Sequence, residues 1–165
     1  MIVPSDLILV APLLLVGYLH RRISQKGTFF LVLSNMPVTI MHEMSHFIVA
    51  LLVGGEPTGF SLWPKKEGNQ WILGSVTARV TLLSAVPTAL APLLWLPVGG
   101  LLLVERNALS GDSLEKLCGV YLAAYLCMAA CIPSWQDIKI VLSHPMSLLL
   151  WSAVLAVLTS ALYYS

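Results

Sequence analysis

Long apolar stretches, separated by short polar connections, occupy most of the chain. They cover about residues 3–19, 28–53, 80–104, 114–132 and 146–164. Each comes close to or exceeds the roughly 20 residues that a helix needs to cross the hydrocarbon core of a bilayer. The third stretch contains Pro87, Pro92 and Pro97, which are expected to bend it. The pattern predicts an all-α polytopic membrane protein with about five transmembrane helices, in which residues 1–165 form a single membrane domain.

The connection after the second stretch has a different pattern. Residues 58–63 and 71–79 are two short runs rich in β-branched and aromatic side chains, on either side of a polar turn at 64–70. Such runs around a turn are typical of a β-hairpin. Tryptophan occurs in both runs, and this side chain prefers the headgroup level of a bilayer. We therefore expect a short membrane-associated hairpin over about residues 58–79, with an amphipathic surface loop as the alternative.

The composition agrees with the membrane assignment. Apolar residues make up 58% of the chain and charged residues only 10%. A soluble domain has about 25% charged residues, so we expect an integral, multi-pass membrane protein. The net charge is +1 and no basic run is present, so nucleic acid is not expected as a partner. The cationic residues of the connections divide evenly between the two predicted sides, four on each, so the positive-inside rule decides neither the orientation nor the membrane.

Three ionisable side chains interrupt the second apolar stretch, where the run 42–46 reads His-Glu-Met-Ser-His. Each costs about 2.5–3.5 kcal/mol at the centre of a membrane helix, so a compensating partner is expected. On a helix, His42 and His46 project from one face and can reach one metal ion. Glu43 is one step round the helix, close enough to take a proton from a water on that metal. The spacing predicts a Zn²⁺ site, and no organic cofactor is expected.

A catalytic zinc site usually takes three protein ligands, and the scarcity of acids allows elimination. Three acids belong to the connection on the far side of the membrane: Glu105, Asp112 and Glu115. Glu56 would require a sharp fold-back, and Glu67 belongs to the polar turn. Asp137 emerges on the same side as His46, just after Pro133, which is expected to break the helix there. Elimination therefore favours Asp137 as the third ligand.

Alternatives stay open at three positions. An Asp just after a helix break also suits the first turn of a new helix, which is the structural interpretation of Asp137. His144 lies on the same side and is a second candidate ligand, whereas an interfacial histidine before Pro145 is the simpler interpretation. Asn35, one heptad before His42, is a candidate for stabilising an oxyanion. For Asn35 we favour an interhelical hydrogen bond.

Together these features resemble the site-2 protease family of intramembrane zinc metalloproteases. The resemblance covers about residues 28–140: the motif helix, the hairpin, the next apolar stretch and an Asp near the end of the following one. The family usually carries Leu-Asp-Gly, often after Asn-x-x-Pro, and this chain has neither. Its run 133–137, Pro-Ser-Trp-Gln-Asp, is similar to the Pro-Ser-x-x-Asp variant of divergent members. The resemblance thus identifies a compact, divergent member.

The resemblance implies roles for the site residues, an activity and partners. Zinc would be held by His42, His46 and Asp137, and Glu43 would act as general base and then as proton donor. The activity would be intramembrane hydrolysis of membrane proteins or peptides, in regulated intramembrane proteolysis. The expected partners are the substrate, the lipid bilayer and a regulatory membrane subunit. We also expect the hairpin to present a strand edge to an extended substrate segment.

Two other functions use the same residues. A membrane metal-binding or metal-transport protein would need the three ligands but not a base at Glu43. A catalytically inactive relative would act as a binding partner of membrane proteins and would need neither. Substitution of Glu43 therefore separates the protease from both alternatives.

Overall fold

The structure, a computed structural model, describes residues 4–68 and 70–164. Residue 3, the predicted start of the first stretch, and both ends of the predicted domain lie outside the described residues. The longer helices are α1 (Pro4–Ser24), α2 (Thr28–Leu52), α4 (Trp95–Val104), α6 (Leu114–Ala130), α7 (Trp135–Ser143) and α8 (Pro145–Tyr164). The shorter ones are α3 (Ala85–Ala89), the 3₁₀ helix η1 (Ala91–Leu94) and α5 (Arg106–Ser110). The strands are β1 (Glu56–Ser61), β2 (Lys65–Glu67), β3 (Gln70–Ile72) and β4 (Ser75–Arg79).

The helices follow the apolar stretches, with one division. Helices α1, α2, α6 and α8 coincide closely with four of the stretches, whereas the third stretch is divided into α3, η1 and α4. Its three prolines lack the backbone N–H that a continuous helix needs, which explains the division. Helix α5 forms in a connection for which no helix is predicted, whereas α7 is the new helix that the structural interpretation of Asp137 implies. The mostly helical fold with a small antiparallel sheet agrees with the prediction.

The number of membrane spans stays a prediction. Within the described part of the chain, α8 alone is a single helix long and apolar enough to cross a membrane. Helices α6 and α7, bent by 45° at a short break, would supply a second if they form one broken span. The apolar segment of η1 and α4 is shorter.

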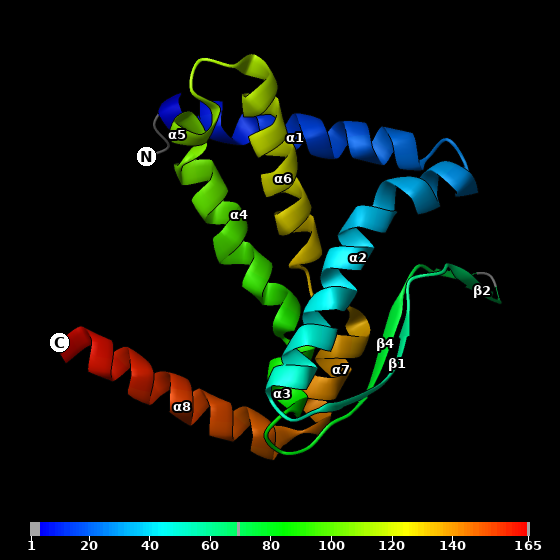
Figure 1. The fold of residues 1–165 in the computed structure, drawn as a ribbon, viewed down its shortest axis with the longest axis vertical. Helices are drawn as coiled ribbons and strands as arrows, with labels where there is room; N and C mark the ends of the chain where they lie inside the picture. The colour runs from blue at the N-terminus through cyan, green and yellow to red at the C-terminus, as the bar shows by residue number, and fades with distance from the viewer. Residues whose placement is uncertain (1–3, 69, 165) are drawn as a thin grey trace.

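The helices form an elongated body with α1 across one end. Helix α6 packs against α4, α1 and α2, and α8 extends away from the opposite end of the body (Figure 1). The buried centre includes Leu103 of α4 and Tyr121 and Ala124 of α6. A Cβ added to Gly99 would lie only 3.1 Å from the Cβ of Cys127, so glycine permits the close approach of α4 and α6. The first turn of α8 is tied to the body, because Ser147 Oγ accepts the Val86 N–H at 3.3 Å.

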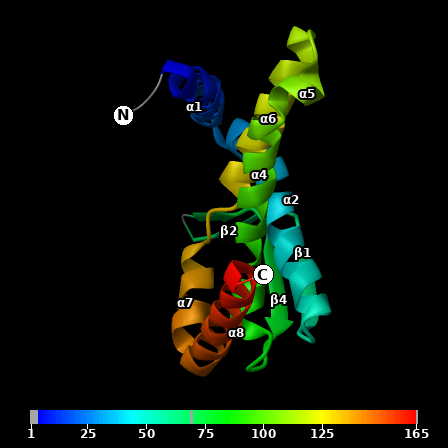
Figure 2. The same cartoon turned by 90° about the vertical axis from the view of Figure 1, so that its left-hand side faces the viewer.

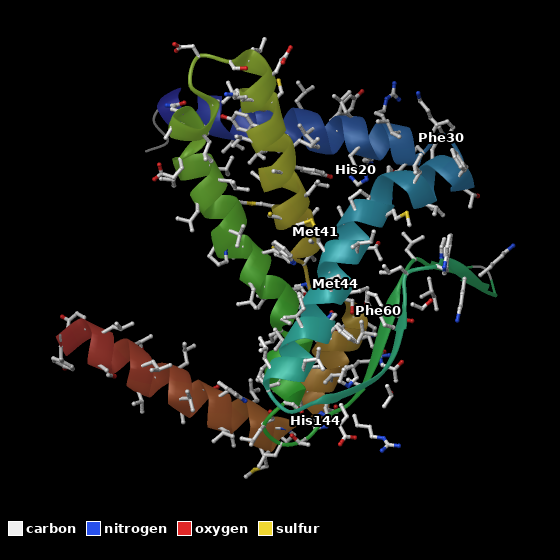
Figure 3. All side chains as sticks on the ribbon, viewed as in Figure 1. His20, Phe30, Met41, Met44, Phe60 and His144 are labelled. Atoms are coloured by element: carbon white, nitrogen blue, oxygen red, sulfur yellow. The ribbon has the colours of Figure 1, made fainter. Side chains whose placement is uncertain are left out.

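The predicted hairpin is present, but its limits differ from those expected. Strand β1 pairs with β4 and β2 with β3, both antiparallel, so two short ladders continue one hairpin. The predicted polar turn 64–70 was therefore too wide, since it contains β2 and the start of β3. The reversal lies instead near Gly68, whose φ of 59° suits glycine. Phe60 of β1 packs against Phe47 of α2, with ring centroids 5.4 Å apart, and holds the hairpin beside that helix (Figure 3).

Candidate metal centre

Three predicted ligand residues meet between α2 and α7. His46 Nε2 lies 3.2 Å from Asp137 Oδ1, and His42 Nε2 lies 3.4 Å from Asp137 Oδ2. The two ring nitrogens, His46 Nε2 and His42 Nε2, are 3.2 Å apart. His46 and Asp137 are only 7% and 5% exposed. We call His42, His46 and Asp137 the metal trio, because each offers one donor atom to a common point.

The hydrogen bonds of the two rings determine which nitrogen faces that point. His42 Nδ1 lies 3.0 Å from the Ala130 carbonyl oxygen, and His46 Nδ1 lies 2.7 Å from that of Thr88. A carbonyl oxygen only accepts, so each Nδ1 donates its N–H and a neutral ring presents the lone pair of Nε2. Metal-ligating histidines typically donate their second nitrogen in this way. Two lone pairs and a carboxylate then face one another, and a cation between them satisfies all three.

The separations fit zinc. Four donors in a tetrahedron with bonds of about 2.0–2.1 Å stand about 3.3 Å apart. In the metal trio the two ring nitrogens are 3.2 Å apart, and each lies 3.2–3.4 Å from one of the two Asp137 oxygens. With one donor atom from each residue, the three atoms lie within 4.8 Å of one another. The trio supplies three donors, which leaves the fourth position for water or substrate. The donor types and their close approach therefore fit a zinc ion.

Helix ends provide the two carbonyl oxygens. The last carbonyls of a helix have no intrahelical partner, and Ala130 ends α6 while Thr88 lies in the last turn of α3. In a continuous helix the Ala130 oxygen would accept the N–H of Ser134. At the break before α7, that N–H instead donates to Asp137 Oδ2 at 2.6 Å. The break thus frees one carbonyl for His42 and orients the carboxylate at the same time.

Asp137 lies in the first turn of α7 and also faces both histidines, so it meets both interpretations that its sequence context allows. Ser134 caps α7, and its Oγ accepts the N–H of Asp137 at 3.2 Å. The Asp137 carboxylate accepts in return from Ser134, so the two residues form a capping box. The same carboxylate faces both histidines. The first-turn interpretation and the position beside the histidines are therefore compatible, because a carboxylate has enough lone pairs for both.

Glu43 borders a cavity next to the metal trio. The cavity measures about 490 Å³ and lies between α2, α3, α7 and strand β4. Helices α2 and α7 stand on opposite sides of this half of the molecule, and α3 packs against both (Figure 2). The backbone N–H of Val76 on β4 interacts with the Glu43 carboxylate. The catalytic role of Glu43 stays a prediction, but its position beside both metal trio and cavity suits it.

The other candidates lie elsewhere. His144 caps the end of α7, where its Nδ1 lies 2.9 Å from the Ile140 carbonyl oxygen, and it is outside the metal trio (Figure 3). Asn35 Nδ2 donates to Leu31 O at 2.8 Å and to Ser24 Oγ of α1 at 3.3 Å. The interhelical hydrogen bond favoured for Asn35 is therefore the correct interpretation. Glu56 is exposed and pairs with Arg79 at 3.8 Å, which agrees with its elimination as a ligand.

Some contributors to the site were not predicted. The carbonyls of Ala130 and Thr88 carry no sequence signal, because every residue has one. The role of Ser134 did have a signal, since Ser-x-x-Asp after a helix break matches the capping-box pattern. Trp95 donates its Nε1 to the Met41 carbonyl oxygen at 3.0 Å and so joins η1–α4 to the motif helix.

A family model described as Peptidase M50B-like matches residues 8–164. The chain belongs to this family. The resemblance to site-2 proteases is thereby confirmed, and membership in the M50B-like peptidases supports a metallopeptidase of that type. The family is generally zinc-dependent and typically embedded in membranes, which agrees with the metal trio and with the apolar helix α8. No curated protein and no solved structure matches the chain.

Proposed function

We propose that this M50B-like chain is an intramembrane zinc-dependent endopeptidase that cuts membrane-spanning or membrane-associated proteins. The observation that carries the proposal is the metal trio: two imidazoles and a carboxylate that face one another, with both Nδ1 atoms engaged by carbonyl oxygens. Glu43, one residue from the first ligand, borders the same cavity. A metal site alone needs no such base, whereas a hydrolase does.

Each residue of the site has a separate role in the proposed peptide hydrolysis. Zinc, when bound, lowers the pKa of a water molecule to about 7 and polarises a carbonyl oxygen. His42 and His46 keep their rings oriented through Ala130 O and Thr88 O. Glu43 takes a proton from the attacking water and delivers it to the leaving nitrogen.

The proposal places the reaction within the membrane. Many large apolar side chains are exposed, including Leu149, Leu155 and Val157 of α8 at 64%, 63% and 68%. A lipid environment would cover them, and the predicted five spans would place the metal trio below the lipid surface. Bulk water is scarce at that depth, so hydrolysis there requires a site that binds its own water molecule. The bilayer, a membrane-protein substrate and a regulatory membrane subunit are the proposed partners.

Strand β4 is the proposed docking edge for the substrate. Among the described residues, β4 pairs with β1 alone, and residues from Ser75 to Ala78 line the cavity. The peptide bonds of a substrate helix are hidden in its own hydrogen bonds, so the segment to be cut must be extended. Pairing with β4 would hold it extended beside the metal trio. Val76, Val80 and Ile140 give the cavity an apolar lining that suits apolar substrate side chains.

Glu43→Gln tests the proposed function. Purified protein is reconstituted in vesicles with a pool of single-span peptides, products are identified by mass spectrometry, and bound zinc is measured separately. We expect the variant to keep its zinc while kcat falls by about 10²–10⁴, because the amide cannot accept the proton. Equal cleavage by both proteins would contradict proteolysis. Uptake of zinc into the vesicles that is the same for wild type and Glu43→Gln would favour the transport alternative instead.

A further inference from the structure

Gly74 brings the hairpin into close contact with the motif helix. It lies in the break between β3 and β4 and lines the cavity beside the metal trio. A Cβ at this position would lie 2.7 Å from Cγ2 of Thr39 and 3.0 Å from Cγ of Glu43. Real Cβ atoms are essentially never found under 3.0 Å from another heavy atom, so a side chain here would displace its neighbours.

The requirement for glycine is one of space and not of backbone angle. Among the described glycines, those with positive φ are Gly27, Gly54, Gly68 and Gly111. Gly74 is outside this group, so alanine is compatible with its backbone. The effect of a substitution at Gly74 therefore comes from the contact with α2.

We propose that Gly74 is a positioning residue for Glu43: its missing side chain lets the strand that borders the cavity lie directly against the base. The proposal deepens the proposed function and rests on it. Two residues further along, the Val76 N–H interacts with the Glu43 carboxylate, so the same approach that Gly74 permits also brings this N–H to the base. Strand β4 then has two tasks, since it orients the base and offers its edge to the substrate.

The contact of an added methyl group at Gly74 with Glu43 can be relieved by either of two rearrangements. The Glu43 side chain swings away, which moves the carboxylate, or the strand lifts off α2, which withdraws Val76. Either change misplaces the base relative to the metal trio without touching a ligand. A misplacement of about 1 Å can cost on the order of 100-fold in rate.

The contact and its consequence are tested together with Gly74→Ala, Thr39→Ser and the double variant. Thr39→Ser removes the Cγ2 methyl at the shortest contact and keeps the hydroxyl. Gly59→Ala is the matched control, because it lies on the partner strand and its added Cβ would have an ordinary 3.6 Å contact to Thr77 Cβ. Bound zinc, Tm of the zinc-loaded protein in detergent, and kcat and KM with the cleaved peptide from the pool are measured for all of them.

We expect Gly74→Ala to lower kcat by about 10- to 100-fold with unchanged zinc content and little change in KM. Thr39→Ser alone is expected to behave like wild type, and in the double variant it should recover much of the lost kcat and of any lost Tm. Gly59→Ala should retain wild-type kcat. An unchanged kcat in Gly74→Ala would overturn the proposal. A loss of zinc in parallel with activity, or effects of the two substitutions on Tm that simply add, would overturn it as well.

The measurements separate this inference from the proposed function. The non-additive Tm of the double variant reports the contact at Gly74 without any substrate. Wild-type protein that holds zinc and cuts no peptide in the pool would instead contradict proteolysis itself.

Discussion

The two sides of the cavity are held in different ways. On the helical side, helix ends supply carbonyl oxygens to the His42 and His46 rings, and the cap of α7 orients Asp137. On the strand side, β4 is held by backbone pairing with β1 and by packing on α2, and its other edge has no strand partner among the described residues. A metal site needs side chains fixed to within a fraction of an ångström. A substrate edge needs backbone groups that accept many sequences.

Asp137→Ala is the most severe test of the helical side of the cavity, because it removes one of the three proposed ligands. The variant leaves two imidazoles without their carboxylate partner, so we expect bound zinc to fall from about one per chain to nearly none and cleavage to disappear. Metal analysis of purified protein is the measurement. His144→Ala is the control, because that ring caps α7 outside the metal trio. A protein that keeps full zinc after Asp137→Ala would show that the third donor is another group.

The strand side is tested with Ala78→Pro. The Val76 N–H interacts with Glu43, which lies outside the β1–β4 pair, and alternate residues of a strand point the same way, so we expect the Ala78 N–H to face the free edge. Its partner in β1 is Pro57, which has no N–H to exchange. Losing this donor should lower kcat/KM about tenfold, equivalent to one hydrogen bond of about 1.4 kcal/mol.

The control for the strand side is Ala78→Ser, which keeps the N–H at nearly the same size and is expected to cleave normally. Zinc content and Tm are measured for both variants. Zinc lost together with cleavage in Ala78→Pro would mean that the hairpin is structural and not a docking edge.

Ser134→Ala is the mildest change to the helical side, because it leaves every donor of the metal trio in place. The variant loses the hydroxyl that caps α7, at a cost of about 1 kcal/mol in stability. Zinc affinity should fall by roughly 10- to 100-fold, because Asp137 loses part of its support. Competition with a chelator measures the affinity. Ser143→Ala removes a hydroxyl from the other end of α7, where it bonds Ile140 O, and should leave zinc affinity unchanged.

Residues close together in the chain were the ones that sequence reasoning placed well. The hairpin and the shared face of His42 and His46 follow from local periodicity, which needs no tertiary information. Asp137 was reached by elimination, and only because the chain has so few acids. Element boundaries are predicted less accurately, since the polar pattern predicts a turn where β2 and the start of β3 lie. Short strands of three residues depend on their partner for stability, and that pairing is not visible in composition.

A helix that carries His42, Glu43 and His46 in an apolar chain predicts a metal and a base wherever that helix folds, because the spacing of these residues is local. How these side chains are held depends on contacts between segments that are far apart in the chain. The carbonyls of Thr88 and Ala130, the double role of Asp137 and the need for glycine at position 74 arise where distant segments meet. Such contacts depend on where helices end and how closely a strand approaches them. No local pattern of side chains encodes that distance.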